Sequence, residues 1–222
     1  MTKNMLPYFW SCKRGEKMLT KICDVLTEKI RKEMPEIDDE KAEEINYGLQ
    51  NIIGEIPKIL LVFVISYFLG VFKWTLFTFI ALFIYKGASG GIHLKTHVGC
   101  ILLTTAFYCV IPLISQHFEI PLSIKIVLGI AIWIFGMIMI KLYAPADTEA
   151  IPIFEEKVKR KKKIVSYISF SVGIFIAIIN PNNTASNILL LANFVQTLTI
   201  TNLSYKLTKS KHGYEVYEEM YS

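Results

Sequence analysis

Residues 122–142 read LSIKIVLGIAIWIFGMIMIKL, a run whose only charged side chains, Lys125 and Lys141, lie close to its two ends. A straight helix needs about 20 mostly apolar residues to cross the hydrocarbon core of a bilayer. A lysine near the end of such a helix can extend its ammonium group to the polar interface. The stretch therefore predicts a membrane-spanning helix.

Five more apolar runs occur along the chain, and together they indicate a membrane protein with several helical spans. The 222 residues are 53% hydrophobic and 19% charged, which leaves too little charge to cover a soluble domain once the apolar runs are set aside. We therefore expect an all-α fold, a polytopic transmembrane helical bundle. The further runs cover residues 59–72, 74–85, 98–115, 164–179 and 188–200.

Lys73 decides how the first two of these runs are interpreted, because it lies between them. A single long span would bury this lysine in hydrocarbon, which is costly. We therefore expect two spans joined by a turn at residues 70–74, the first of them starting near Ile52. With further spans predicted at residues 98–116, 122–142, 164–180 and 186–204, the total is six.

The distribution of positive charge supports six spans. With this count, both termini and the loops 86–97 and 143–163 share one side, which also holds the basic run VKRKKK at 158–163. Basic residues beside spans mark the cytoplasmic face, so we expect a multi-pass protein of the cell membrane with both termini in the cytoplasm. Because the basic run adjoins an apolar run, we interpret the net charge of +5 as a membrane signal and expect no nucleic-acid partner.

The N-terminal region, residues 1–56, is predicted to form amphipathic helices at the membrane surface, with a small soluble helical hairpin as the alternative. The first helix is expected to end near Pro35, and Asp38 or Asp39 is expected to cap the second. Residues 57–205 would then be the transmembrane domain and residues 206–222 a cytoplasmic tail. The apolar face of the first helix consists of Met18, Leu19, Ile22, Val25, Leu26 and Ile30.

Candidate chemistry gathers in residues 86–100, KGASGGIHLKTHVGC. On a continuous helix His93 and Cys100 would lie about 10.5 Å apart along the axis, too far for contact, but the glycines permit a bend, for example at Gly99. An imidazole can take the proton of a thiol, and a helix N-terminus lowers the pKa of a thiol, so the pair could form a cysteine nucleophile. The alternative is that Cys100 only fills apolar space, as we expect of Cys12, Cys23 and Cys109.

Other functions compete for the same stretch. His93 and His97 have the i, i+4 spacing of a zinc helix, but the glutamate of HExxH is replaced by leucine and a third ligand is missing, so we expect no metal and no other cofactor. Residues 87–90, GASG, fit the GxSG pattern of rhomboid-type intramembrane serine proteases, which would make Ser89 the nucleophile. A non-enzymatic membrane carrier or scaffold is the remaining alternative.

Two motifs of the chain resemble the accessory gene regulator B (AgrB) family. SGGIH at 89–93 is followed by Cys100, and YAPADTEAIPI at 143–153 is followed by the basic run. The resemblance covers most of the chain and implies a bacterial membrane cysteine endopeptidase of quorum sensing. Such an enzyme cleaves an AgrD-like propeptide, forms a thioester on its cysteine and promotes cyclisation to a thiolactone, the autoinducing peptide.

The resemblance also implies the residues and partners of this activity. It assigns catalytic roles to His93 and Cys100, and it implies membrane lipids, the propeptide and a second copy in a homodimer as partners. Many relatives carry an arginine before the Gly-Gly pair, where this chain has Lys86, which keeps the charge but loses the planar guanidinium. The group that orients His93 is open between Asp147, Glu149, Ser89 and a backbone carbonyl. We expect supporting roles for Lys86, Ser89, Gly90, Gly91 and Asp147.

Overall fold

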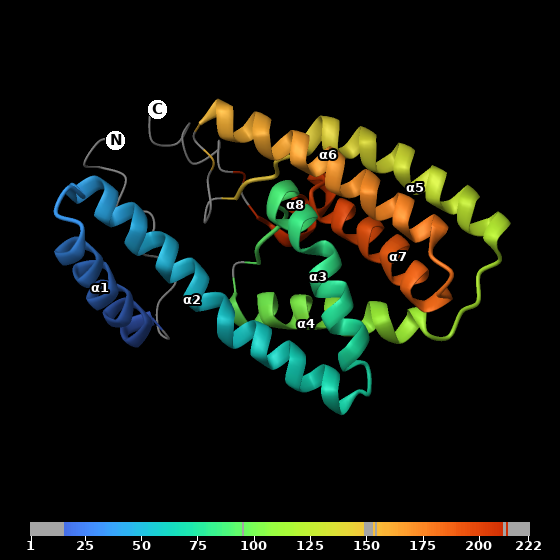
Figure 1. Cartoon of the computed structure of the whole chain (residues 1–222), viewed down its shortest axis with the longest axis horizontal. Coiled ribbons are helices and arrows are strands. Elements are labelled where there is room, and N and C mark those ends of the chain that lie inside the picture. Colours follow the sequence, from blue (N-terminus) through green and yellow to red (C-terminus); the bar gives the residue numbers. More distant parts are fainter. Residues whose placement is uncertain (1–15, 95, 149–152, 154, 211, 213–222) are drawn as a thin grey trace. The chain divides into compact units, whose positions relative to one another are not determined.

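The structure is a computed structural model that describes residues 16–94, 96–148, 153, 155–210 and 212. Cys12, Glu149 and the end of the tail lie outside these residues. In the described part all regular elements are helices (Figure 1), as predicted. They are α1 (Glu16–Glu33), α2 (Asp39–Phe68), α3 (Phe72–Ser89), α4 (His97–Ser115), α5 (Leu122–Tyr143), α6 (Glu156–Ile179), α7 (Asn183–Thr199) and α8 (Asn202–Thr208). Backbone contacts divide the chain into two units, Met1–Leu61 and Val62–Ser222, each described by itself.

The first unit pairs α1 with the beginning of α2. Asn46 donates to the Asp24 carboxylate at 2.8 Å, and Arg31 contacts Asp39 at 2.6 Å. The inward face of α1 carries Cys23 and Thr27, whereas Ile22 and Val25 of the predicted apolar face are 46% and 52% exposed. These exposed side chains are the ones that a membrane surface would cover, and the surface location of α1 stays a prediction.

The beginning of α2 follows the predicted capping chemistry. The carboxylate of Asp38 accepts a hydrogen bond from the backbone N–H of Lys41 at 2.8 Å, which satisfies one of the free amides of the first turn. The predicted second amphipathic helix and the predicted first span are continuous in the structure. They form one helix of 30 residues that runs through Pro57.

The second unit begins with the end of α2 and a turn into α3. Two helices replace the single long run, as Lys73 indicated, and Gly70 takes the positive φ of 71° that the turn requires. The turn itself is shorter than predicted, because α3 already starts at Phe72. Lys73 therefore lies in the first turn of α3, where its ammonium group is 5.4 Å from the centre of the Trp74 ring.

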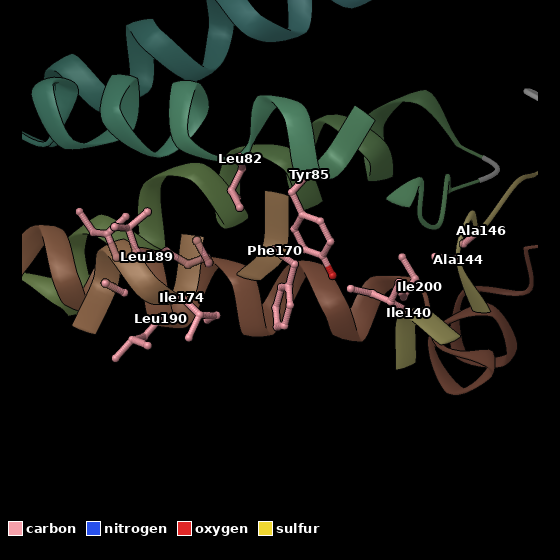
Figure 2. Packing of buried hydrophobic residues seen from close by; sticks show 14 of the residues in the cluster. Leu82, Tyr85, Ile140, Ala144, Ala146, Phe170, Ile174, Leu189, Leu190 and Ile200 are labelled. Atoms are coloured by element: carbon pink, nitrogen blue, oxygen red, sulfur yellow. The ribbon is translucent and has the colours of Figure 1, made fainter. Parts of the chain in front are cut away.

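The core of the second unit forms around α7, which packs against α3, α4, α5 and α6. Figure 2 shows Tyr85 of α3 meeting Phe170 of α6, with ring centres 5.2 Å apart. Gly136 of α5 makes room for this ring, since a Cβ there would collide with Phe170. Helix α7 is unusual for an apolar run, because its polar residues Asn187, Asn193, Gln196 and Thr197 are all buried.

The predicted break at residues 117–121 is confirmed. The break predicted at 180–185 is shorter in the structure, because α7 already begins at Asn183, capped by Asn182 through the amide of Ala185 at 2.9 Å. The predicted cytoplasmic loops are both shorter in the structure. Residues 156–163, which we predicted as part of a polar loop, form the first two turns of α6. Lysine and arginine are good helix formers, so the basic run extends the helix.

Four helices are long and apolar enough to cross a membrane, namely α2, α4, α5 and α6, within the described residues. The pair α7 and α8, bent by 69°, would make a fifth span if it crosses as one broken element. The membrane character predicted from the sequence agrees with these helices. The count of six, which also requires α3 to cross, stays a prediction.

Candidate functional site

The two sequence motifs lie side by side in the structure, although they are far apart in the sequence. Gly90 and Ala146 form an isolated parallel bridge between the end of α3 and the segment after α5. The amide of Gly91 donates to the Ala146 carbonyl at 3.0 Å, and the amide of Ala146 donates to the Ser89 carbonyl at 2.8 Å. The segment 144–147 therefore holds the start of the loop that carries His93.

Both glycines of this loop are required by their surroundings. Gly90 has a φ of 71° and a ψ of −145°, and a Cβ at this position would overlap the Ala146 carbonyl. Gly91 has a φ of 140°, and a Cβ there would lie 2.7 Å from the hydroxyl of Thr199. Only glycine combines these backbone angles with such close approach. The two glycines thus shape the loop through its backbone, and the supporting role predicted for them stays a prediction.

Helix α7 holds the same loop from the other side. The side-chain amide of Gln196, which is 1% exposed, donates to the Ser89 hydroxyl at 3.1 Å and to the Gly90 carbonyl at 2.8 Å. The amide of Ile92 donates to the Thr199 carbonyl at 3.2 Å. Sequence reasoning missed Gln196 and Thr199. The available signal was the polar series at 193, 196 and 197, whose spacing places it on one face of an otherwise apolar helix.

His93 lies in the irregular segment between α3 and α4, and its side chain is exposed. Its carbonyl accepts a hydrogen bond from the Ser210 hydroxyl at 2.7 Å. Ser210 follows α8, so the beginning of the C-terminal segment contacts the backbone of the predicted catalytic histidine. This contact was also missed, because nothing in the local pattern connects residues that lie so far apart in sequence.

Cys100 lies in the first turns of α4 and is half-buried. Thr96 caps this helix, since its hydroxyl accepts from the amide of Gly99 at 3.2 Å, and the amide of Cys100 donates to the Thr96 carbonyl at 3.0 Å. The chain therefore changes direction before His97, not at Gly99 as we suggested. Gly99 is helical, and it lets the Thr96 hydroxyl approach closely. His93 and Cys100 thus do not share a continuous helix.

Three further residues of the sequence predictions, Lys86, Ser89 and His97, lie around the same loop. Lys86 places its ammonium group 5.5 Å from the Phe107 ring centre and 5.3 Å from that of Tyr108, and Phe107 lies two turns beyond Cys100 on α4. Ser89 is fully buried beneath Gln196. The side chain of His97, one of the two candidate zinc ligands considered in the sequence, lies outside the described part of the structure.

Asp147 lies next to the bridge in the half-buried segment that follows α5. Its carboxylate accepts from the amide of Ile153 at 3.3 Å, and its carbonyl accepts from the hydroxyl of Tyr205 at 2.8 Å. Tyr205 belongs to α8 and stacks on His212, with ring centres 3.9 Å apart. The second motif is thereby connected both to the His93 loop and to the C-terminal segment.

The geometry describes a helical membrane protein in which a Gly-Gly-x-His loop and an Ala-Pro-Ala-Asp segment are joined through their backbones. Residues 23–200 match the sequence model of the family described as Accessory gene regulator B. The chain belongs to this family, as the motifs indicated.

Individual relatives agree with this assignment. An AgrB-like protein of Listeria welshimeri is 30% identical over 199 residues, which cover 89% of this chain and 94% of the relative. The Accessory gene regulator protein B of Staphylococcus aureus strain RF122 is 31% identical over 157 residues, covering 71% and 81%. No solved structure matches the chain.

Proposed function

We propose that the chain is a membrane cysteine endopeptidase of quorum sensing that cleaves the C-terminal part of an AgrD-like propeptide and promotes thiolactone cyclisation. The observation that carries the proposal is the backbone bridge between Gly90 and Ala146. It joins the two motifs on which the family resemblance rests, and it fixes the loop of His93 directly before the helix of Cys100. Rigid support of this kind is what a catalytic pair requires.

The proposed reaction has two acyl transfers. His93 takes the proton of the Cys100 thiol, and the thiolate attacks a backbone carbonyl carbon of the propeptide. The C–N bond breaks, the amine of the C-terminal fragment leaves with the proton from His93, and an acyl thioester remains on Cys100. His93 then takes the proton of the propeptide's own cysteine thiol, whose sulfur attacks the thioester carbon. Cys100 leaves as thiolate and regains the proton from His93.

The covalent intermediate matters for the energetics of the proposed reaction. Making a thioester directly from an amide is uphill, whereas exchange of one thioester for another is nearly balanced. Cleavage and cyclisation therefore share one acyl-enzyme, and holding the propeptide thiol near while excluding water favours the ring over hydrolysis.

Burial favours Cys100 over the other described nucleophiles. The Ser89 side chain is fully buried and bonded to Gln196, which disfavours the serine-protease alternative. Cys109 is 2% exposed in the middle of α4. Cys23 is also fully buried, and burial together with Asp24 raises the pKa of its thiol, which keeps it protonated.

The proposal includes the predicted arrangement in the membrane. Six crossings, with α3 as the second, would put both termini, the His93 loop and the basic start of α6 in the cytoplasm, where an intracellular propeptide is available. The propeptide is expected to lie on the inner leaflet beside residues 16–56. The homodimer implied by the resemblance stays a prediction of this arrangement.

The test is reconstitution of the full chain in lipid nanodiscs with a candidate propeptide, followed by mass spectrometry. Wild type is expected to acquire the mass of the N-terminal propeptide portion, released by hydroxylamine, and to yield a ring product. Cys100→Ala should abolish both species, and His93→Ala should slow acylation by about 10²-fold or more. Ser89→Ala should still form the adduct.

Two outcomes would decide against this function. Full cleavage by Cys100→Ala together with loss only in Ser89→Ala would favour the serine protease. Transfer of intact peptide into sealed proteoliposomes that hold the same protein, without cleavage by any variant, including wild type, would favour the carrier.

A further inference from the structure

A pocket lies beside the backbone bridge between Gly90 and Ala146, and the proposed reaction does not use it. It encloses ≈ 540 Å³ between the end of α5, the segment 144–147, the first turns of α6, Asn202 of α8 and His212. Because α5 and α6 are both candidate spans, the pocket lies where a membrane helix ends and its neighbour begins. Such positions coincide with the headgroup layer of a bilayer.

The pocket has a surplus of positive charge from the beginning of α6. Lys159, Arg160 and Lys163 line it, against the carboxylates of Asp147 and Glu156. The Lys159 ammonium contacts Glu156 at 3.1 Å, and that of Lys163 donates to the Lys141 carbonyl at 2.6 Å. Within the described residues, no hydrogen bond or ion pair engages the Arg160 guanidinium, whose planar donors suit a phosphate.

Exposed apolar side chains lead away from the pocket along both helices. On α6, Ile164 and Ile168 follow Arg160 at four-residue steps and are 50% and 60% exposed. On α5, Leu142 lines the pocket at 60% exposure, and Ile138 one turn earlier is 49% exposed. A basic pocket next to these two rows of exposed apolar side chains, which we call the apolar tracks, matches a ligand with an anionic head and long hydrocarbon tails.

We propose that this pocket binds the phosphodiester headgroup of one anionic phospholipid, with its acyl chains along α5 and α6. A soluble phosphate would satisfy the cations but leave the apolar tracks uncovered, and an acidic peptide would do the same. Basic pockets between membrane helices are known to select anionic lipids. The lipid would brace the segment 144–147, and hence the His93 loop, from the side of the bilayer.

The basic run supplies a matched control for a test of this site. Lys159 and Arg160 line the pocket, whereas Lys161 and Lys162, next to them in the sequence, are not among the described residues that line it. The variants K159Q/R160Q and K161Q/K162Q therefore remove the same charge from the same two turns. Only the first pair removes it from the pocket.

Native mass spectrometry of the full-length protein, released from detergent micelles titrated with phosphatidylglycerol or phosphatidylcholine, would count bound lipids directly. We expect one phosphatidylglycerol on the wild type, bound in preference to phosphatidylcholine. K159Q/R160Q should weaken that binding about tenfold or more, while K161Q/K162Q should change it less than about threefold. R160Q alone should also weaken the binding of phosphatidylglycerol. Because Arg160 is exposed, this single variant should fold normally even if the double variant does not.

Three results would overturn the proposal. Equal losses in the two double variants would mean that general surface charge attracts the lipid. Displacement of the lipid by millimolar inorganic phosphate would assign the pocket to a free anion. Binding of an oligo-glutamate peptide that depends on Lys159 and Arg160, without any preference for phosphatidylglycerol, would assign it to a peptide.

Discussion

At the scale of single residues, Gly90 is the position at which the end of α3 meets the segment after α5, and the hydrogen bonds to Ala146 come from the backbones of its neighbours Ser89 and Gly91. Position 90 must lack a side chain, because a Cβ there would overlap the Ala146 carbonyl. Gln196 acts through its side chain instead, because its amide supplies two hydrogen bonds to the loop. These two residues therefore test different parts of the support for His93.

Gly90→Ala is expected to reduce propeptide cleavage at least tenfold, because the new Cβ collides with the Ala146 carbonyl and the backbone angles suit only glycine, a strain of about 1–3 kcal/mol. Gly87→Ala is the control, since a Cβ there meets nothing within 4 Å and alanine favours the helix. Rates of cleavage in nanodiscs would be compared with thermal unfolding of the same samples. Equal activity of the two variants would refute the role of the bridge.

Gln196→Leu should lower kcat for cleavage by about 10-fold with little change in KM, because the loop loses its two bonds while the propeptide surface is untouched. It leaves the Ser89 hydroxyl and Gly90 carbonyl short of a donor, at a stability cost of about 1–3 kcal/mol. Gln116→Leu, at an exposed glutamine at the far end of α4, is the matched control. A change confined to KM would indicate that Gln196 instead contacts substrate.

At the scale of elements, α4 depends on a cap that also positions the predicted nucleophile. Thr96→Ala should cost about 0.5–2 kcal/mol and fray the first turn, so that Cys100 is alkylated several-fold faster. Asn182→Ala removes the equivalent cap from α7. The alkylation rate of the Cys100 peptide, followed by mass spectrometry, should rise only in the first variant, and a rise in both would indicate general loosening.

The sequence predicted the helices better than the contacts between them, because helix ends carry local signals and tertiary contacts do not. The predicted breaks at residues 117–121 and 180–185 carry local signals, namely proline, asparagine and interrupted hydropathy. A helix ends at each of them, although the second break already closes at residue 182. The start of α6 was misplaced because charge suggests a loop while lysine itself favours helix. The contacts of Gln196, Thr199 and Ser210 with the His93 loop depend on tertiary packing, which no local pattern encodes.

At the scale of the whole molecule, the proposed topology of six crossings requires α3 to cross the bilayer. With six crossings, Leu69→Cys and Glu119→Cys lie outside the cell and should react with a membrane-impermeant maleimide in intact cells. Lys161→Cys should react only after permeabilisation. Labelling of Glu119→Cys without Leu69→Cys would place the α2–α3 turn on the inner side and reduce the count.

The backbone bridge has one more consequence, which concerns how the family can change over evolutionary time. Because Ala146 contributes only its N–H and C=O groups to the bridge, a substitution at 146 calls for no compensating substitution at 90. Statistical methods that infer contacts from correlated changes would therefore detect nothing between these positions, although they touch. The contact should instead appear in the family as an unvarying glycine at position 90. Position 146 should vary freely among side chains that fit the space around it.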